Sequence, residues 1–126
     1  MININDGIIT IAEGLVITPK FSFEQFKKTK FYNNQDGIKM IYLDKQQVID
    51  GRKYMISLFF RMNIIYMVSL ICCDVDFTEN EEQKRKLLHD DILKEYGINK
   101  QKSFDWGKIS SDYDKRSNVS SINIFF

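Results

Sequence analysis

The sequence predicts an α+β fold, in which an antiparallel sheet of about six or seven short strands packs against one long and one short helix. Two observations support this expectation. Residues 53–60 and 64–73 are apolar runs on either side of a polar break, which is typical of a hairpin. Residues 79–96 are rich in charge but carry leucine and isoleucine at helical spacing, which is typical of a helix lying on a sheet.

Length and composition indicate a single α+β domain that spans residues 1–126. The chain is 44% hydrophobic and 13% aromatic, which supplies a core and excludes a disordered chain. Its 18 Lys and Arg against 17 Asp and Glu give a net charge of +1. Because binding to a phosphate backbone requires a surplus of cations, we expect no nucleic acid among its partners.

Two stretches in the first third of the chain predict strands. Residues 7–17 are β-branched and punctuated by glycine, which favours two short strands joined by a turn near Glu13 and Gly14. Residues 38–43 predict a further strand.

A short helix and a tight turn are expected from local capping and turn chemistry. Ser22 and Gln25 have the spacing of a capping box, so we expect a helix over residues 22–28. Asp50 and Gly51 are typical of a tight turn, because glycine tolerates a positive φ angle.

The apolar stretch 55–73 is long enough to cross a membrane, but a hairpin explains it better. Arg61, near its middle, costs about 2.5–3.5 kcal/mol in a bilayer, whereas each large apolar residue returns only about 0.3–0.6 kcal/mol. We therefore expect no membrane contact. Both faces of the two strands are apolar, so we expect each face to be covered, either by helices of this chain or, on one face, by a partner chain.

The second half predicts one helix and a closing pair of strands. Thr78 is a suitable N-cap and Gly97 a suitable stop for a helix over 79–96. Residues 106–113 and 119–126 then predict two strands separated by a polar turn.

Cysteine usage and the N-terminus point to the cytoplasm. The first residues contain no basic region, long apolar run or small-residue cleavage site, so we expect no signal peptide. Cys72 and Cys73 are neighbours whose side chains point to opposite faces of a strand, and we expect two free thiols, as suits a reducing compartment. Because His89 is the only histidine, we expect no metal and no cofactor.

The residues that could carry catalysis have structural interpretations. We expect His89 to lie on the surface of its helix or half-buried, without the neighbours that a general base requires. Cys72 and Cys73 close an apolar strand, which favours structural thiols. Trp106, beside Gly107, is expected to plug the end of the core, with an anchor for a partner as the alternative. We therefore expect the protein not to be an enzyme.

The densest acidic run lies between the long hairpin and the long helix. It lacks the glycine of a calcium-binding loop, which leaves either a solvated loop or an acidic contact patch for a basic partner. The residues predicted to bind the partner are Asp74, Asp76, Glu79, Glu81 and Glu82.

The most distinctive segment of the chain lies in its C-terminal third. Residues 104–117 read FDWGKISSDYDKRS and lead into the last strand. This segment resembles a group of small bacterial hypothetical proteins that end in WG-x-I-x-S-x-Y-D-x-R and a β-hairpin. Proteins of this kind are associated with polymorphic or contact-dependent toxins, so the resemblance implies an immunity protein.

The expected function is that of a non-enzymatic cytoplasmic binding protein, an immunity protein that binds and occludes a cognate bacterial toxin. The alternative is a structural or assembly module that associates with itself through the surplus apolar face of the hairpin, as a homodimer. A third alternative is an enzyme that uses His89 or a cysteine.

Overall fold

The computed structural model describes residues 1–12 and 14–126. The helices are α1 (Phe23–Lys27) and α2 (Glu82–Glu95), and a 3₁₀ turn, η1 (Glu79–Glu81), precedes α2. The strands are β1 (Ile9–Ile11), β2 (Leu15–Ile17), β3 (Met40–Tyr42), β4 (Gln47–Ile49), β5 (Arg52–Arg61), β6 (Ile64–Cys72), β7 (Gln101–Phe104), β8 (Gly107–Asp114) and β9 (Val119–Phe125).

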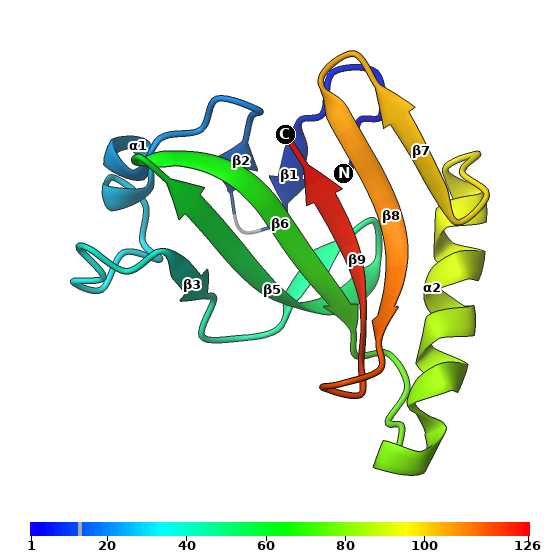
Figure 1. The fold of residues 1–126 in the computed structure, drawn as a ribbon. Helices are drawn as coiled ribbons and strands as arrows, with labels where there is room; N and C mark the ends of the chain where they lie inside the picture. The colour runs from blue at the N-terminus through cyan, green and yellow to red at the C-terminus, as the bar shows by residue number, and fades with distance from the viewer. Residues whose placement is uncertain (13) are drawn as a thin grey trace.

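The main sheet of the described chain has seven antiparallel strands, and β1 and β2 form a separate two-stranded sheet (Figure 1). The main sheet runs in the order β3-β5-β6-β9-β8-β7, and β4 pairs with the other end of β5. The expected α+β fold with an antiparallel sheet is confirmed. The strand count is higher than expected, because β4 and β7 are short strands that the sequence did not predict.

The predicted capping box and the predicted tight turn in the first half of the chain are both confirmed. Ser22 Oγ accepts a hydrogen bond from Gln25 N–H at 3.1 Å, and Ser22 N–H donates to Gln25 Oε1 at 2.9 Å, which completes the capping box of α1. Asp50 and Gly51 both adopt positive φ and join β4 to β5. The predicted turn at Glu13 lies outside the described residues.

The long hairpin consists of β5 and β6, joined by Met62 and Asn63. Both turn residues adopt positive φ, at 52° and 64°, as the tightest hairpin turns require. The strand register shifts between Phe59 and Phe60, which marks a bulge near the turn.

Helix α2 ends as its sequence predicts, but it begins at Glu82, because residues 79–81 of the predicted helix form the 3₁₀ turn η1. Thr78 precedes η1, and its N–H donates to the Glu81 carboxylate at 3.3 Å. Gly97, at φ 78°, ends the helix, and Ile98 N–H donates to the Leu93 carbonyl at 2.9 Å. None of the described helices has the length and apolar character that crossing a membrane requires.

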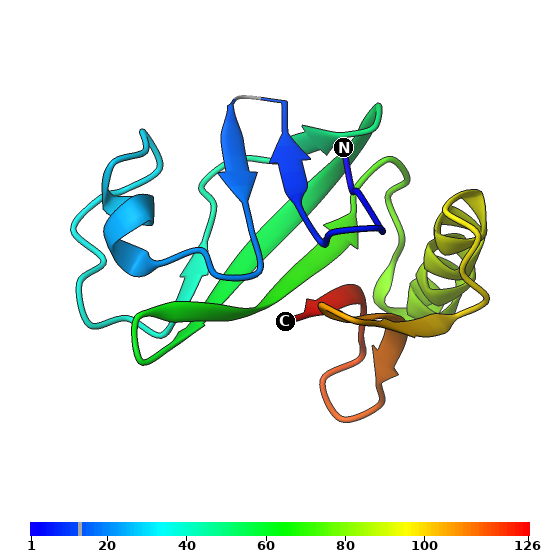
Figure 2. The same ribbon diagram turned by 90° about the horizontal axis from the view of Figure 1, so that it is seen from above.

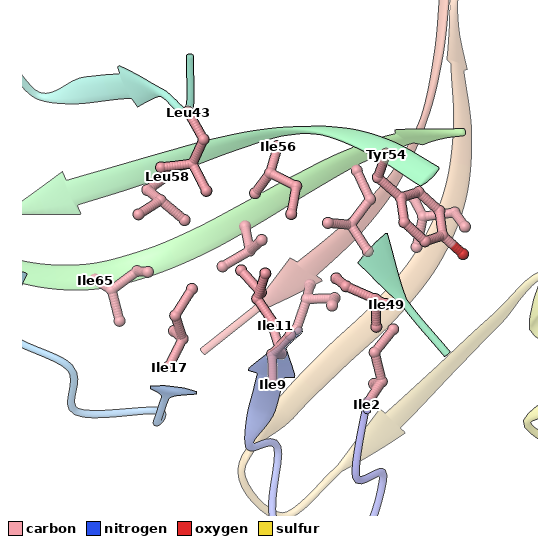
Figure 3. Packing of buried hydrophobic residues seen from close by; sticks show 14 of the residues in the cluster. Ile2, Ile9, Ile11, Ile17, Leu43, Ile49, Tyr54, Ile56, Leu58 and Ile65 are labelled. Atoms are coloured by element: carbon pink, nitrogen blue, oxygen red, sulfur yellow. The ribbon is translucent and has the colours of Figure 1, made fainter. Parts of the chain in front are cut away.

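The core lies on one face of the main sheet. The β1–β2 hairpin, α1 and α2 all lie on this side of the sheet (Figure 2). Ile9, Ile11 and Ile17 of the small sheet point toward β5 and β6, where Ile56 and Leu58 meet them (Figure 3). Each of these five side chains is at most 1% exposed. We call this side of the main sheet the inner face and the opposite side the outer face.

Trp106 joins the turn between β7 and β8 to the N-terminal segment. Its indole N–H donates to the Ile4 carbonyl at 2.9 Å, and its ring stacks on Phe104 at 5.1 Å between centroids. Gly7 lies directly against the same ring. Trp106 therefore plugs the end of the core, which agrees with the first of its two interpretations.

Candidate functional site

The acidic run lies in the connection between β6 and α2, and the structure places its members in different environments. Asp74 accepts a hydrogen bond from the backbone N–H of Lys53 at 2.9 Å and lies 3.6 Å from the Arg52 guanidinium. It therefore helps to fasten the far end of the β5–β6 hairpin. Its carboxylate is only partly exposed and already has a cationic neighbour.

Glu81 serves the start of the helix. Its carboxylate accepts hydrogen bonds from the Thr78 hydroxyl at 3.0 Å and from Lys84 Nζ at 3.0 Å. The Lys84 ammonium, together with the Thr78 donors, lowers the pKa of this carboxyl below its ordinary value. A partner would have to compete with these local contacts.

Glu82 is buried, so it does not belong to an exposed contact patch in this structure. Its carboxylate accepts a hydrogen bond from Ser120 N–H at 2.8 Å and lies 3.4 Å from the Arg85 guanidinium. The Ser120 hydroxyl donates in turn to the Glu82 carbonyl at 3.0 Å. The sequence could not indicate this role, because β9 approaches Glu82 from 38 residues further along the chain.

Asp76 and Glu79 are the members of the run whose carboxylates remain directed at solvent. Both residues are exposed, and within residues 1–12 and 14–126 neither carboxylate has a hydrogen bond or ion pair. The backbone carbonyl of Glu79 accepts a hydrogen bond from Asn118 Nδ2 at 2.9 Å, which ties this loop to the β8–β9 turn. The exposed part of the predicted site is thus centred on these two residues.

His89 is fully buried, which corrects the expectation of a surface or half-buried histidine. Its Nε2 accepts a hydrogen bond from the backbone N–H of Cys72 at 3.0 Å, so the neutral ring carries its proton on Nδ1. Nδ1 has no hydrogen-bond partner in the described part of the chain. Burial, reinforced by the Arg85 charge, lowers the pKa of His89 to about 4. At neutral pH this ring therefore serves as a structural acceptor between α2 and β6.

Both cysteines are free thiols, as expected. Cys72 is buried, and burial raises the pKa of its thiol, which opposes formation of the thiolate nucleophile. Cys73 is partly exposed, and its Sγ donates to the Ile71 carbonyl at 3.4 Å. Among the described residues, no group of three or more His, Cys, Asp or Glu side chains is placed to hold a metal ion.

The outer face of the main sheet is a second candidate surface. None of the described helices or strands covers it (Figure 2). Three large side chains on it are well exposed, Tyr42 at 62%, Met55 at 52% and Met40 at 37%. The sequence shows that both faces of β5 and β6 are apolar, but it does not show which face the rest of the chain would leave open.

Small hollows also mark the surface. One of 230 Å³ is lined by Lys30, Phe31, Asp44, Lys45 and Gln47. Two others, of 210 and 480 Å³, lie beside Met62 at the tip of the long hairpin. None of the site residues predicted from the sequence lines these three hollows.

Comparison with protein-family models, with curated proteins and with solved structures gave no match to this chain.

Proposed function

We propose that this chain is a non-enzymatic cytoplasmic binding protein, an immunity protein that binds and occludes a cognate bacterial toxin. The observation that supports this most directly is that two of the candidate catalytic residues are buried and structural, whereas two of the acidic residues are exposed and unpaired. His89 and Cys72 hold α2 and β6 together inside the fold, whereas Asp76 and Glu79 extend unpaired from a surface loop. The resemblance of the segment around Trp106 to proteins associated with toxins supports the same assignment.

The acidic loop is the proposed contact with the toxin. Asp76 and Glu79 supply two unpaired negative charges, and the exposed Val75 between β6 and η1 adds an apolar contact. A basic groove on a toxin would be attracted to this loop over a Debye length of about 8 Å at physiological salt. Asn118 holds the loop against the β8–β9 turn, so little ordering would be needed on binding.

Co-expression tests the function. An open reading frame next to the gene for this chain would be expressed alone and together with it, and bacterial growth would be measured. The proposal expects growth to stop with the neighbour alone and to resume when this chain is present. A neighbour that is toxic in both cases, or harmless in both, would contradict an immunity function.

The surface is tested separately with the purified toxin. We expect the double variant Asp76→Asn, Glu79→Gln to bind the toxin at least about tenfold more slowly at low salt and to lose part of the salt dependence of association. Asp105→Asn, in the exposed turn between β7 and β8, is the matched control and should associate as the unaltered chain does. Equal association rates for the unaltered chain, the double variant and the control would show that the acidic loop does not belong to the interface.

A further inference from the structure

We infer that the outer face of the main sheet is covered by a second copy of this chain, in a two-fold symmetric dimer whose sheets pack face to face. This inference concerns a different surface from the acidic loop and does not depend on the toxin. It follows from the order of side chains across the outer face, which the strand register fixes.

On β5, β6, β9 and β8, the first row runs from apolar side chains to a cation. Phe59 pairs with Met67, Met67 with Phe125 and Phe125 with Lys108, so the four residues lie side by side on β5, β6, β9 and β8. Successive residues of a strand point to opposite faces, and Leu58, like the strand residues next to the others in this row, is buried in the core. The row therefore faces outward.

The third row lies two rows away along the strands. Like the first row it is apolar on β5 and β6, but its member on β8 is an anion. Met55 pairs with Ile71 on β6, and Ser121 on β9 pairs with Asp112 on β8. Asp112 accepts hydrogen bonds from Ser110 Oγ at 2.6 Å and from Asn123 Nδ2 at 2.8 Å, both on Oδ2. Its Oδ1 has no hydrogen bond within the described residues and is held in a fixed direction.

Between these rows lies a central row whose members on β5, β6 and β9 are small and polar, and whose member on the edge strand β3 is Tyr42, paired with Ser57. Ser57 pairs with Ser69, and Ser69 pairs with Asn123. Small side chains at the centre allow two sheets to approach to the usual spacing of about 10 Å. On these three strands, short residues in the middle and larger apolar ones on both sides shape the surface to receive a similar surface, and Tyr42 lies at its β3 edge.

A two-fold axis along the central row makes this face complementary to itself. Such an axis exchanges the first row with the third and leaves the strand positions in line. Phe59 then lies opposite Met55 of the second copy, and Met67 lies opposite Ile71 of the second copy. Lys108 lies opposite Asp112 of the second copy, and the symmetry gives this pairing twice. An axis along the strands would not bring these charges together, so the charge pattern selects one arrangement.

The test is the mass of the protein in solution, measured by light scattering over a wide range of concentrations. We expect a species of twice the 14.9 kDa chain mass. Lys108→Asp alone and Asp112→Lys alone should each weaken the dimer at least about tenfold, because each places like charges opposite one another. The double variant Lys108→Asp, Asp112→Lys restores opposite charges and should restore the dimer.

Two further variants show that the effect belongs to this face. Met67→Glu places a charge in the first row and should give a monomer, whereas Lys115→Asp, in the exposed β8–β9 turn, should dimerise as the unaltered chain does. Thermal unfolding of each variant verifies that it is folded. A single-chain mass at every concentration would overturn the dimer, and a double variant that stays monomeric would overturn the proposed axis. Neither result would bear on the acidic loop.

Discussion

At the scale of single residues, burial decides what the polar side chains of this protein do. His89 and Glu82 have the chemistry of a general base and a surface charge, yet both lie inside and satisfy backbone N–H groups of β6 and β9. A buried N–H without a partner costs about 1–3 kcal/mol, so these acceptors are needed by the fold. The effect of changing such a residue is therefore expected in stability.

His89 should make the protein less stable in mild acid. The unfolded chain takes up a proton near the ordinary pKa of 6.5, but the folded chain does so only near pH 4. Between these values acid favours the unfolded state, so the free energy of unfolding should fall as pH falls, by about 2 kcal/mol at pH 5. Well below pH 4, where the folded and unfolded states both bind the proton, this contribution should change no further.

Denaturant unfolding between pH 7 and pH 5 measures this effect. The chain has one histidine, and its carboxyls titrate mainly below this range in the unfolded state, so the slope belongs to His89. In His89→Gln, which keeps an acceptor for Cys72 N–H, the slope should disappear. A variant that keeps the slope of the unaltered protein would show that another group is responsible.

Gly7 should be intolerant of a side chain because of Trp106. A Cβ atom on Gly7 would lie 2.5 Å from the indole ring, whereas a Cβ on Gly37 would meet no atom within 4 Å. Both glycines have similar positive φ angles, 76° and 80°, so alanine strains the backbone equally at the two positions. Gly7→Ala should therefore lower the free energy of unfolding by about 1–3 kcal/mol more than Gly37→Ala. Equal losses would mean that the ring moves aside freely.

At the scale of elements, the seating of α2 on the sheet depends on its first turn. Glu82 joins this turn to β9 through its hydrogen bond with Ser120. In the later turns of the helix, Ile92 and Leu93 are buried against the sheet. The charge-rich sequence of the helix gives only a weak apolar stripe, and Leu87 is 63% exposed. Polar contacts at the N-terminal end of α2 therefore compensate for the small apolar area that the helix buries on the sheet.

Replacing the neighbouring residues Glu81 and Glu82 by alanine should lower the free energy of unfolding by very different amounts. Glu82→Ala leaves Ser120 N–H without its acceptor and should lower the free energy of unfolding by about 2–3 kcal/mol. Glu81→Ala removes exposed capping and ion-pair contacts and should cost about 1 kcal/mol or less. Glu82→Gln keeps the acceptor and should fall between them. Urea unfolding of the three variants measures the order, and a Glu81 variant that is the less stable would contradict this account of α2.

At the scale of the whole molecule, the central strands of the main sheet are long and buried on their inner face, and the edge strands are short. β5 and β6 each have neighbours on both sides, and their inner residues are buried, whereas β3 and β7 are short strands at the two edges. Strands that lose their hydrogen bonds only on global unfolding are protected by the full free energy of folding, and edge strands open locally.

Hydrogen exchange should reveal this gradient. Amides in the middle of β5, β6 and β9 should exchange at least about a thousandfold more slowly than amides of β7, if the protein has the stability of an ordinary domain. Two-dimensional NMR after transfer into D₂O measures the rates residue by residue. Uniform exchange across all strands would indicate a molecule that opens as one unit.

The sequence by itself determined the elements whose signals are local. The capping box at Ser22, the turn at Asp50 and Gly51 and the glycine stop of α2 depend on contacts within a few residues, and the structure confirms each. The long hairpin is also confirmed, because two adjacent apolar runs joined by a two-residue turn can pair only with each other locally. The structure likewise confirms the free thiols. The short strands β4 and β7 were missed because β7 (QKSF) is mostly polar and β4 (QVI) has only two apolar residues before the Asp50–Gly51 turn.

Only the tertiary structure decided which side chains are available. Glu82 and His89 are no less polar in sequence than Asp76, yet contacts from distant strands place two inside and one outside. The apolar pattern of β5 and β6 gives two equivalent faces, and the choice of the one to cover rests on where the β1–β2 hairpin and α2 pack. Such choices depend on pairings between residues far apart in the chain, which local patterns cannot specify.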